Sequence, residues 1–356
     1  MKKAGYLLLA LVLIFVVAGC GNKSDQGAQS TTAPQSTASG DTQNTPAPAE
    51  ENATINLYTS ESQDLVNEMV NDFKAANPGI DVNIFRSGTG PVISKIQAEM
   101  GAGGIQADVI WFADIDFFGQ LAEKGLLEAY NSPEAKDLDP RYVYDGGKYY
   151  EVRQIFNVIG YNTNKVKTAP KSWKDLADPS LKGKVAIADP NYSGAAFFTL
   201  ATFVNDQNLG WDYFKSLKAN NTKFEQSNGN LTSKVSSGEY SAVSVVDFMV
   251  RNAKNSGSPV DTVWPSEGAV LIPTPVGIIS SSQHKEAAKK LIDYFLSEAG
   301  QKFFVKQGYI PVKDGVGVPE GAPNLKDIKI YPLATEFMSK NRDNLKKTFG
   351  EIFETK

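Results

Sequence analysis

From residue 55 onward, short runs of β-branched and apolar residues alternate with longer runs of helical periodicity. Residues 55–59 alternate as a strand does, and the run after them places Leu65, Met69 and Phe73 on one helical face. The same order recurs with predicted strands at 80–85, 108–112 and 184–188. Because strand–helix–strand units place their strands parallel and cover them with helices, we predict an α/β protein whose parallel-type sheets carry helices on both faces.

Two long β-rich runs, residues 149–161 and 272–280, interrupt this series. Between them lies a second strand–helix series, so we interpret the two runs as crossovers that join two lobes, with the second lobe inserted into the first. The predicted boundaries are 55–155 for the first part of lobe 1, 156–273 for lobe 2, and 274–356 for the rest of lobe 1 with a closing helix at 333–353.

The N-terminal end has the order of a secretory signal peptide, which we predict over residues 1–19. Lys2 and Lys3 precede an apolar run over 7–17 that is too short to span a membrane comfortably. The residues before Cys20 also resemble the lipobox of bacterial lipoproteins, which implies cleavage before Cys20 and diacylation of its thiol. A plain secretory signal or a short anchor is the alternative. Since Cys20 is the only cysteine, we expect no disulfide in the mature domain.

The segment after the signal contains no Val, Ile, Leu, Met or aromatic residue from 21 to 54. Such a composition cannot offset its chain entropy by burial, so residues 20–54 are predicted to be a lipidated cysteine followed by a disordered tether. The formal net charge of the chain is −4, and no basic run typical of nucleic-acid binding occurs. We therefore expect no nucleic-acid partner, and we expect a monomer.

A candidate anion site follows the predicted strand at 184–188. Ser193 and Gly194 stand where this strand turns into an apolar helical run at 195–204. A helix start leaves unpaired backbone N–H groups and a positive dipole end, and glycine lets a ligand approach the backbone closely. We predict an anion cradle here, with an ordinary helix capped by the Ser193 hydroxyl as the alternative.

Motifs of the common enzyme classes are missing from the sequence. It contains no G-x-S-x-G, no H-E-x-x-H and no phosphate-binding P-loop motif, and its single histidine, His284, precedes a predicted surface helix. A secreted hydrolase is the alternative class of protein. Hydrolases that use a Ser–Lys pair or two carboxylates have no short motif by which the sequence could exclude them. We predict that the chain is not an enzyme and that it needs no cofactor.

Several short segments occur in order along the folded part: 57–59, 94–99, 107–109, 160–162, 170–173, 181–184, 189–190, 193–195 and 285–308. In this order they resemble the substrate-binding proteins of bacterial ABC importers, and more narrowly the cluster that includes ferric-iron, phosphonate and sugar-phosphate binders. The resemblance implies a two-lobed periplasmic-binding-protein fold of type II with a ligand cleft between the lobes. It also implies a membrane permease and a separate ATPase as partners, and an extracytoplasmic position held by the lipid on Cys20.

The chain departs from the ferric-iron binders of this family at the metal ligands. Those proteins hold iron with an adjacent tyrosine pair, helped by a His or Glu. The pair falls on Phe248 and Met249 here, and neither residue supplies the anionic oxygen that Fe(III) requires. The His and Glu positions match Ser62 and Ala113. No metal ligand is therefore predicted.

Two other features of the sequence are possible iron ligands. The adjacent pair Tyr149 and Tyr150 lies before the first crossover, where we predict core packing. His284 is predicted to be solvated.

The anion cradle, in contrast, matches the family. In the iron-binding relatives this turn holds a phosphate or carbonate beside the metal, and Ser193, Gly194 and Ala195 match it. A cradle retained without the metal ligands favours a small anion that carries its own phosphate or phosphonate, such as an aminoalkylphosphonate or a sugar phosphate. A ferric-iron-binding protein is the alternative.

The other predicted ligand contacts come from both lobes. Hydroxyl and amide donors to the anion are predicted at Ser60, Ser62, Ser87, Thr89, Ser227 and Asn228. Asp114 and Asp247 are predicted to receive an amine or sugar hydroxyls. For each of these residues, helix capping or surface charge is the alternative role.

Overall fold

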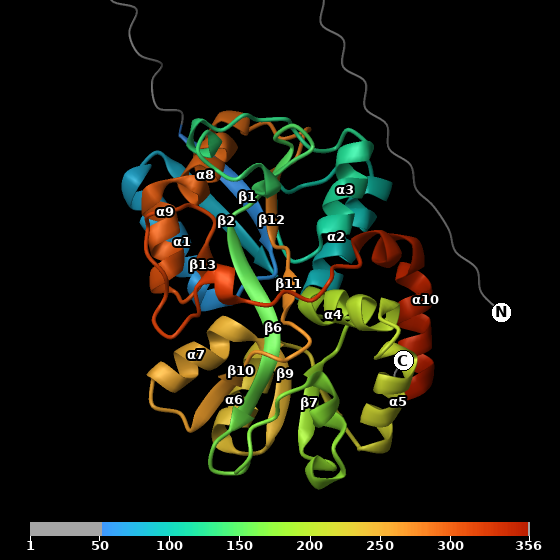
Figure 1. The fold of residues 1–356 in the computed structure, drawn as a ribbon. Coiled ribbons are helices and arrows are strands. Elements are labelled where there is room, and N and C mark those ends of the chain that lie inside the picture. The colour runs from blue at the N-terminus through green and yellow to red at the C-terminus, as the bar shows by residue number, and fades with distance from the viewer. Residues whose placement is uncertain (1–51, 355–356) are drawn as a thin grey trace, which may run out of the picture. The chain divides into compact units, whose positions relative to one another are not determined.

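The computed structural model describes residues 52–354. These residues belong to one compact unit, Pro48–Lys356. The predicted signal peptide, Cys20 and nearly all of the predicted tether lie outside the described residues. Within the compact unit the strands form two sheets, one in the upper half and one in the lower half of Figure 1. No helix among the described residues is both long enough and apolar enough to cross a membrane.

The first sheet has the strand order β2-β1-β3-β12-β5-β4. Its strands are β1 (Ala53–Thr59), β2 (Ile80–Arg86), β3 (Val109–Trp111), β4 (Val143–Tyr144), β5 (Tyr149–Glu151) and β12 (Pro275–Ile278). Strands β1, β2 and β3 are parallel, whereas β12, β5 and β4 join them as antiparallel neighbours. The sheet is therefore mixed, with the predicted parallel part at one edge.

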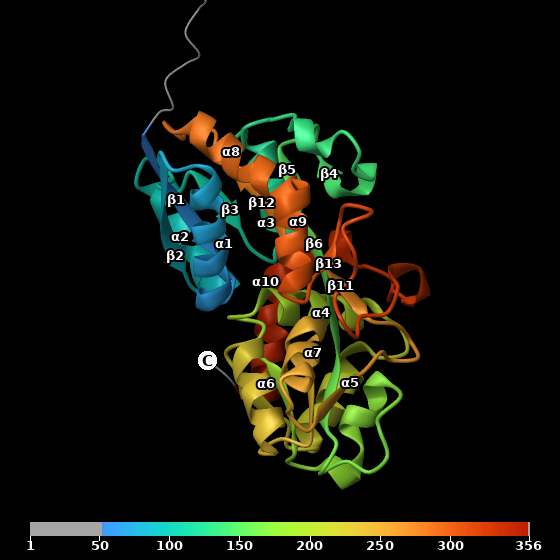
Figure 2. The ribbon, with the colours of Figure 1, turned by 90° about the vertical axis from the view of Figure 1, so that its left-hand side faces the viewer.

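Helices cover both faces of this sheet. They are α1 (Gln63–Ala76), α2 (Thr89–Gly101), α3 (Ile115–Glu123), α8 (Lys285–Leu296) and α9 (Glu298–Lys306). Successive residues of β3 point to opposite faces. Trp111 packs in the cluster that contains α1 and α8, whereas Ile110 packs in the cluster that contains α2 and α3. Figure 2 shows α1 and α8 on the near side of this sheet.

The second sheet has the order β10-β6-β9-β7-β8, with β11 and β13 also paired to β6. Its strands are β6 (Arg153–Asn162), β7 (Val185–Ala188), β8 (Lys223–Glu225), β9 (Ala242–Val246), β10 (Val260–Val263), β11 (Val270–Ile272) and β13 (Ile310–Pro311). Its helices are α4 (Gly194–Asn205), α5 (Gly210–Ala219), α6 (Asn228–Ser237), α7 (Asp247–Asn255) and α10 (Thr335–Phe353). Short 3-10 helices lie at Pro133–Ala135, Pro140–Tyr142, Trp173–Ala177, Pro179–Leu181 and Leu325–Asp327.

The chain passes between the sheets where the sequence predicts. Strand β5 of the first sheet leads into β6 of the second, and β11 of the second leads back into β12 of the first. The two crossovers are tied together by Glu151, whose carboxylate accepts hydrogen bonds from the Thr274 backbone N–H (2.8 Å) and hydroxyl (3.0 Å). The two lobes of the fold thus correspond to the two sheets, and the insertion of the second lobe into the first, with its exact boundaries, stays a prediction.

The closing helix predicted at 333–353 is α10, which begins at Thr335 and ends at Phe353. Helix α10 lies beside α4 and α5 of the second lobe (Figure 1). The rings of Phe349 and Phe353 pack on Phe224, with centroids 5.5 and 4.7 Å apart. An amphipathic pattern shows which helical face is apolar but not which sheet that face will cover, so the sequence did not assign this helix to a lobe.

The crossover carboxyl gives a pH-dependent prediction. Burial raises the pKa of Glu151 to about 8, although the hydrogen bonds from Thr274 oppose this. Between the usual carboxyl range and pH 8 the folded chain thus binds more protons than the unfolded chain, and stability falls as pH rises through this window. We expect the free energy of unfolding to lose about 2 kcal/mol from this group between about pH 6 and 8.5. Glu151→Gln, which stays neutral, should lack that loss in urea unfolding. Equal pH slopes for both proteins would contradict the prediction.

Candidate functional site

A cleft of about 140 Å³ lies between the two lobes. We call it the interlobe cleft. The first lobe lines it with residues that follow β1, β2 and β3: Ser60, Glu61, Ser62, Arg86, Gly88, Thr89 and Ala113. The second lobe contributes Ile155, Tyr192, Ser193, Gly194, Ala195, Gln226, Ser227, Asn228, Gly229, Val246, Phe248 and Met249. The crossovers add Arg153 and Thr274. These residues lie where α/β proteins commonly bind ligands, beyond the carboxyl ends of their parallel strands.

Five helices begin at this cleft. The N-cap residues of α1, α2, α4, α6 and α7 all line it, and they are Ser62, Gly88, Ser193, Ser227 and Val246. Each helix start carries a partial positive charge from its unpaired N–H groups. Convergence of five such ends gives the cleft a positive potential built mainly from neutral groups, which is suited to an anion.

At the start of α4 the Ser193 hydroxyl caps the helix, which is the role that the sequence gives as the alternative, while the anion cradle stays a prediction. The Ser193 hydroxyl accepts a hydrogen bond from the Ala196 N–H (3.2 Å) and one from the Asn228 side-chain amide (3.4 Å). The N–H groups of Gly194 and Ala195 have no acceptor among the described residues. Asn228 in turn accepts from the Val246 N–H (3.3 Å), so it links the starts of α4, α6 and α7.

Three hydroxyl groups of the first lobe complete the polar lining. Ser60, Ser62 and Thr89, which are predicted to bind the ligand, line the cleft, and their side chains make no hydrogen bond to the described residues. Ser62 is the N-cap of α1, but its hydroxyl does not cap that helix. These groups are therefore available to a bound molecule.

Charged residues at the base of the cleft were missed by the sequence analysis. Arg153 is only 1% exposed, and it makes a buried ion pair with Glu61. Its guanidinium lies 4.0 Å from the Tyr309 ring centroid and 4.6 Å from that of Trp111. The Nε and Nη1 atoms of Arg153 are buried without a partner among the described residues. The sequence feature that could have indicated this buried charge is the single arginine, Arg153, within the β-rich run at 149–161.

Arg86 adds a second cation to the lining. It is exposed, and its Nε atom donates to the Glu61 carbonyl oxygen (2.7 Å). With Arg153 and Glu61, the lining carries two positive charges and one negative charge. The side chains therefore add to the positive potential of the helix starts.

Three predicted ligand residues do not line the cleft, and the prediction is corrected for each. Ser87 lies between Arg86 and Gly88, and because successive residues of an extended chain point to opposite sides, its neighbours line the cleft and it does not. Asp114 is buried beneath Arg342, which donates to both of its carboxylate oxygens. Asp247 is fully buried, pairs with Arg251 and accepts from the Phe156 N–H (2.8 Å).

Burial gives Asp247 a structural role. It raises the pKa of this carboxyl, and the adjacent Arg251 guanidinium opposes that shift. The carboxylate joins the first turn of α7 to strand β6, so it supports the cleft from behind.

The positions that match the iron ligands of the family line the cleft as an apolar wall. Phe248 and Met249 do so, and the Phe248 ring packs on Tyr309 with centroids 4.1 Å apart. Tyr149 and Tyr150 are buried in β5, as predicted, and His284 is exposed, as predicted. Over residues 52–354, no group of three or more His, Cys, Asp or Glu side chains is placed to hold a metal ion.

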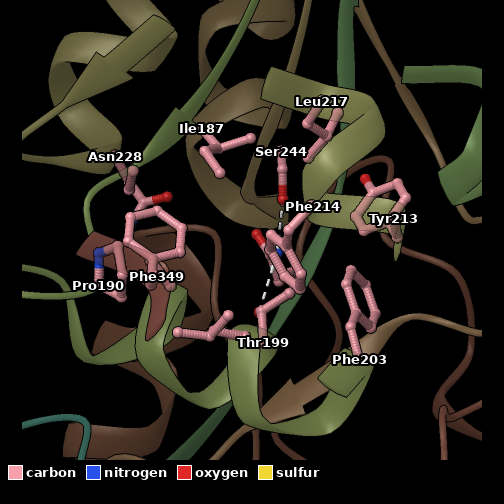
Figure 3. Close-up of a pocket in the computed structure, with 14 residues that line it drawn as sticks. Ile187, Pro190, Thr199, Phe203, Tyr213, Phe214, Leu217, Asn228, Ser244 and Phe349 are labelled. Carbon is pink, nitrogen blue, oxygen red and sulfur yellow. Dashed lines mark hydrogen bonds between the residues drawn. The ribbon is translucent and has the colours of Figure 1, made fainter. Parts of the chain in front are cut away.

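A second, smaller cavity of about 20 Å³ lies inside the second lobe between α4, α5 and β7 (Figure 3). Its walls are mainly apolar, and Asn157 donates within it to Thr199 (3.0 Å) and Ser244 (2.8 Å). This space suits about one water molecule. It belongs to the core of the lobe, and we assign the ligand to the interlobe cleft.

Comparison with known proteins identifies the family. A model of the family described as bacterial extracellular solute-binding protein matches residues 105–341. The chain belongs to this family. The predicted resemblance is thereby confirmed, including its cluster of phosphonate, sugar-phosphate and iron proteins.

Several relatives of this solute-binding protein fall in that cluster. It is 30% identical to a provisionally named 2-aminoethylphosphonate-binding periplasmic protein of Salmonella typhimurium, over 63% of this chain and 66% of the relative. It is 26% identical to the solved periplasmic binding protein AfuA of Actinobacillus pleuropneumoniae with fructose-6-phosphate bound (TM-score 0.78, covering 85% and 99% of the chains). Iron-bound HitA of Pseudomonas aeruginosa, at 22% identity, shares the fold (TM-score 0.73, covering 84% and 99%). The fold is thus the predicted type II two-lobed fold.

The lobes of this solute-binding protein touch through glycines. A Cβ atom on Gly194 would lie 2.0 Å from the Ala113 carbonyl oxygen, and one on Gly90 would lie 2.1 Å from that of Asn191. A Cβ on Gly88 would lie 2.6 Å from the Tyr192 carbonyl oxygen. Only residues without side chains permit this approach, so the structure shows the two lobes in direct contact across the mouth of the cleft.

Gly194→Ala tests this contact. Gly194 has no left-handed backbone angle, so alanine should fold normally, but its Cβ would keep the lobes apart. We expect a larger radius of gyration by small-angle scattering and an unchanged melting temperature. The matched control is Gly101→Ala, because Gly101 ends α2 with nothing near its Cβ position. Equal radii for the two variants would show that the glycine contact does not set the lobe arrangement.

Proposed function

We propose that this chain is the binding component of an ABC importer that captures a small organophosphorus anion. The observation that carries the proposal is the convergence of five helix starts on one cleft, with unpaired N–H groups at Gly194 and Ala195. Capture of a phosphate or phosphonate group needs several donors around one anion, and helix starts supply them without mobile side chains. The free hydroxyls of Ser60, Ser62 and Thr89 face the same space from the first lobe.

The lining also favours an anion with an organic part. Ile155, Tyr192, Phe248 and Met249 give the cleft an apolar wall beside its polar donors. A ligand with a carbon skeleton would bury apolar surface there, whereas inorganic phosphate would leave this wall unused. The aminoethylphosphonate-binding and sugar-phosphate-bound relatives agree with this class.

A ferric-iron function is the weaker candidate. Of the described residues that line the cleft, Glu61 is the one carboxylate, and its charge is already paired with Arg153. The positions that match the tyrosine pair are Phe248 and Met249. Hard Fe(III) prefers several anionic oxygen ligands, which this lining does not supply.

The importer role brings further expectations. A membrane permease and its ATPase would receive the solute, and the chain would act as a monomer outside the cytoplasm, without enzymatic activity. Cys20 would carry the lipid that anchors it to the membrane. Labelling of the expressed chain with a tagged palmitate, against a Cys20→Ser variant, tests this anchor.

Native mass spectrometry of the purified protein is the direct test of ligand class, because it requires no guess about the ligand. A retained compound that loses phosphate or phosphonate on fragmentation would support the proposal. Retained iron would support the ferric alternative. If the protein is empty, calorimetric titration decides, with 2-aminoethylphosphonate, fructose 6-phosphate and ferric citrate as the ligands.

Arg86→Gln is the variant that tests the anion site. Arg86 lines the cleft as an exposed cation, so its loss should weaken binding of either organophosphorus ligand about tenfold, since a charge-assisted hydrogen bond contributes about 1.5 kcal/mol or more. Arg141→Gln is the matched control, because Arg141 is an exposed arginine of the first lobe that pairs with Asp139 and does not line the cleft. Unchanged affinity in Arg86→Gln would reject the assignment of the site.

A further inference from the structure

Helix α10 contacts both lobes, and one of its side chains binds charged groups of the first lobe. The helix packs on α4 and α5 of the second lobe, yet Arg342 reaches the start of α3 in the first lobe. Its Nη1 and Nη2 atoms donate to the two carboxylate oxygens of Asp114 (2.7 and 2.6 Å), while Nε and Nη2 donate to Asp116 (3.2 and 2.8 Å). One guanidinium therefore binds two carboxylates of the opposite lobe.

This contact is shielded from water. The side chains of Asp114 and Asp116 are 3% and 5% exposed, and that of Arg342 is 19% exposed. The guanidinium also lies 4.7 Å from the ring centroid of Phe197, in the first turn of α4. Paired charges in such surroundings interact strongly, and removal of one partner leaves the other buried without compensation.

The contact adjoins the anion-binding end of α4. Asp114 directly follows Ala113, whose carbonyl oxygen meets Gly194, and Phe197 lies one turn after Gly194. Separation of the lobes at this point, with α10 staying on the second lobe, would break all the hydrogen bonds between Arg342 and the two aspartates. It would also expose their charges to water separately.

We infer that Arg342 is a positioning residue for ligand capture, which latches the start of α4 against the first lobe when the cleft is closed. The latch acts through Asp114, Asp116 and Phe197, and it does not touch the ligand. It stabilises the closed arrangement relative to an open one, so less of the ligand's binding energy is needed for closure. The inference goes beyond the proposed function and does not depend on which solute the cleft takes.

Hydrogen exchange of the full chain in detergent, without added ligand, tests the latch. In Arg342→Gln we expect the hydrogen-bonded amides at the lobe contact, those of Ser87 and residues 191–193, to exchange about tenfold faster than in the wild type, because separation of the lobes exposes them to water. Amides of β1 and β9, inside the two lobes, should keep their wild-type rates. Lys340→Gln is the matched control, because it removes only the exposed pair with Glu336 on the same helix.

Two results would overturn the inference. One is acceleration confined to α10 itself, which would mean that Arg342 only anchors the helix. The second result comes from Asp116→Asn, a milder change that keeps the hydrogen bonds of Arg342 to Asp114. This variant decides the question if Arg342→Gln destabilises the whole fold. We expect a smaller but selective acceleration at Ser87 and residues 191–193 in this variant, and no acceleration there would reject the latch.

Discussion

Unpaired backbone N–H groups at helix starts are the groups on which the proposed anion binding depends. A strand that ends at a lobe edge and turns directly into a helix leaves those groups beyond the edge, and five helices do so around one cleft. Since the donors belong to the backbone, they are held by the sheets and need no side-chain ordering when an anion arrives. The serine and threonine hydroxyls beside them add donors without adding charge.

Ionised side chains have a different part in this site. Arg153 is buried with Glu61 and between aromatic rings, so its charge is compensated within the protein and two of its N–H-bearing atoms remain unpaired. Arg86 at the surface supplies the excess positive charge. The buried Arg153–Glu61 pair offers N–H donors to an anion without adding net charge. Arg86 adds one positive charge at the surface, where water solvates it, so no large uncompensated charge is buried in the cleft.

Contacts between the lobes are of three kinds. Gly88, Gly90 and Gly194 allow backbone to meet backbone at the mouth of the cleft, and the crossovers join the lobes at its base through Glu151 and Thr274. Helix α10 adds a third connection, because its apolar face covers the second lobe while its arginine binds the first. The ligand site is therefore enclosed by elements from widely separated parts of the chain.

The sequence by itself determined the alternation of strands and helices, the two crossovers, and the serine–glycine helix start at residue 193, because these depend on local periodicity and on neighbours along the chain. It also identified Ser60, Ser62, Thr89 and Asn228 as residues that line the cleft. Only the tertiary structure decided which carboxylates are available to a ligand and which are held in ion pairs. Asp114 and Asp247 follow strands as ligand residues do, but arginines distant in sequence or one helical turn away bury them in ion pairs. Long-range packing likewise put Arg153 at the base of the cleft and α10 on the second lobe, since an apolar helix face or a lone charge does not specify its partner.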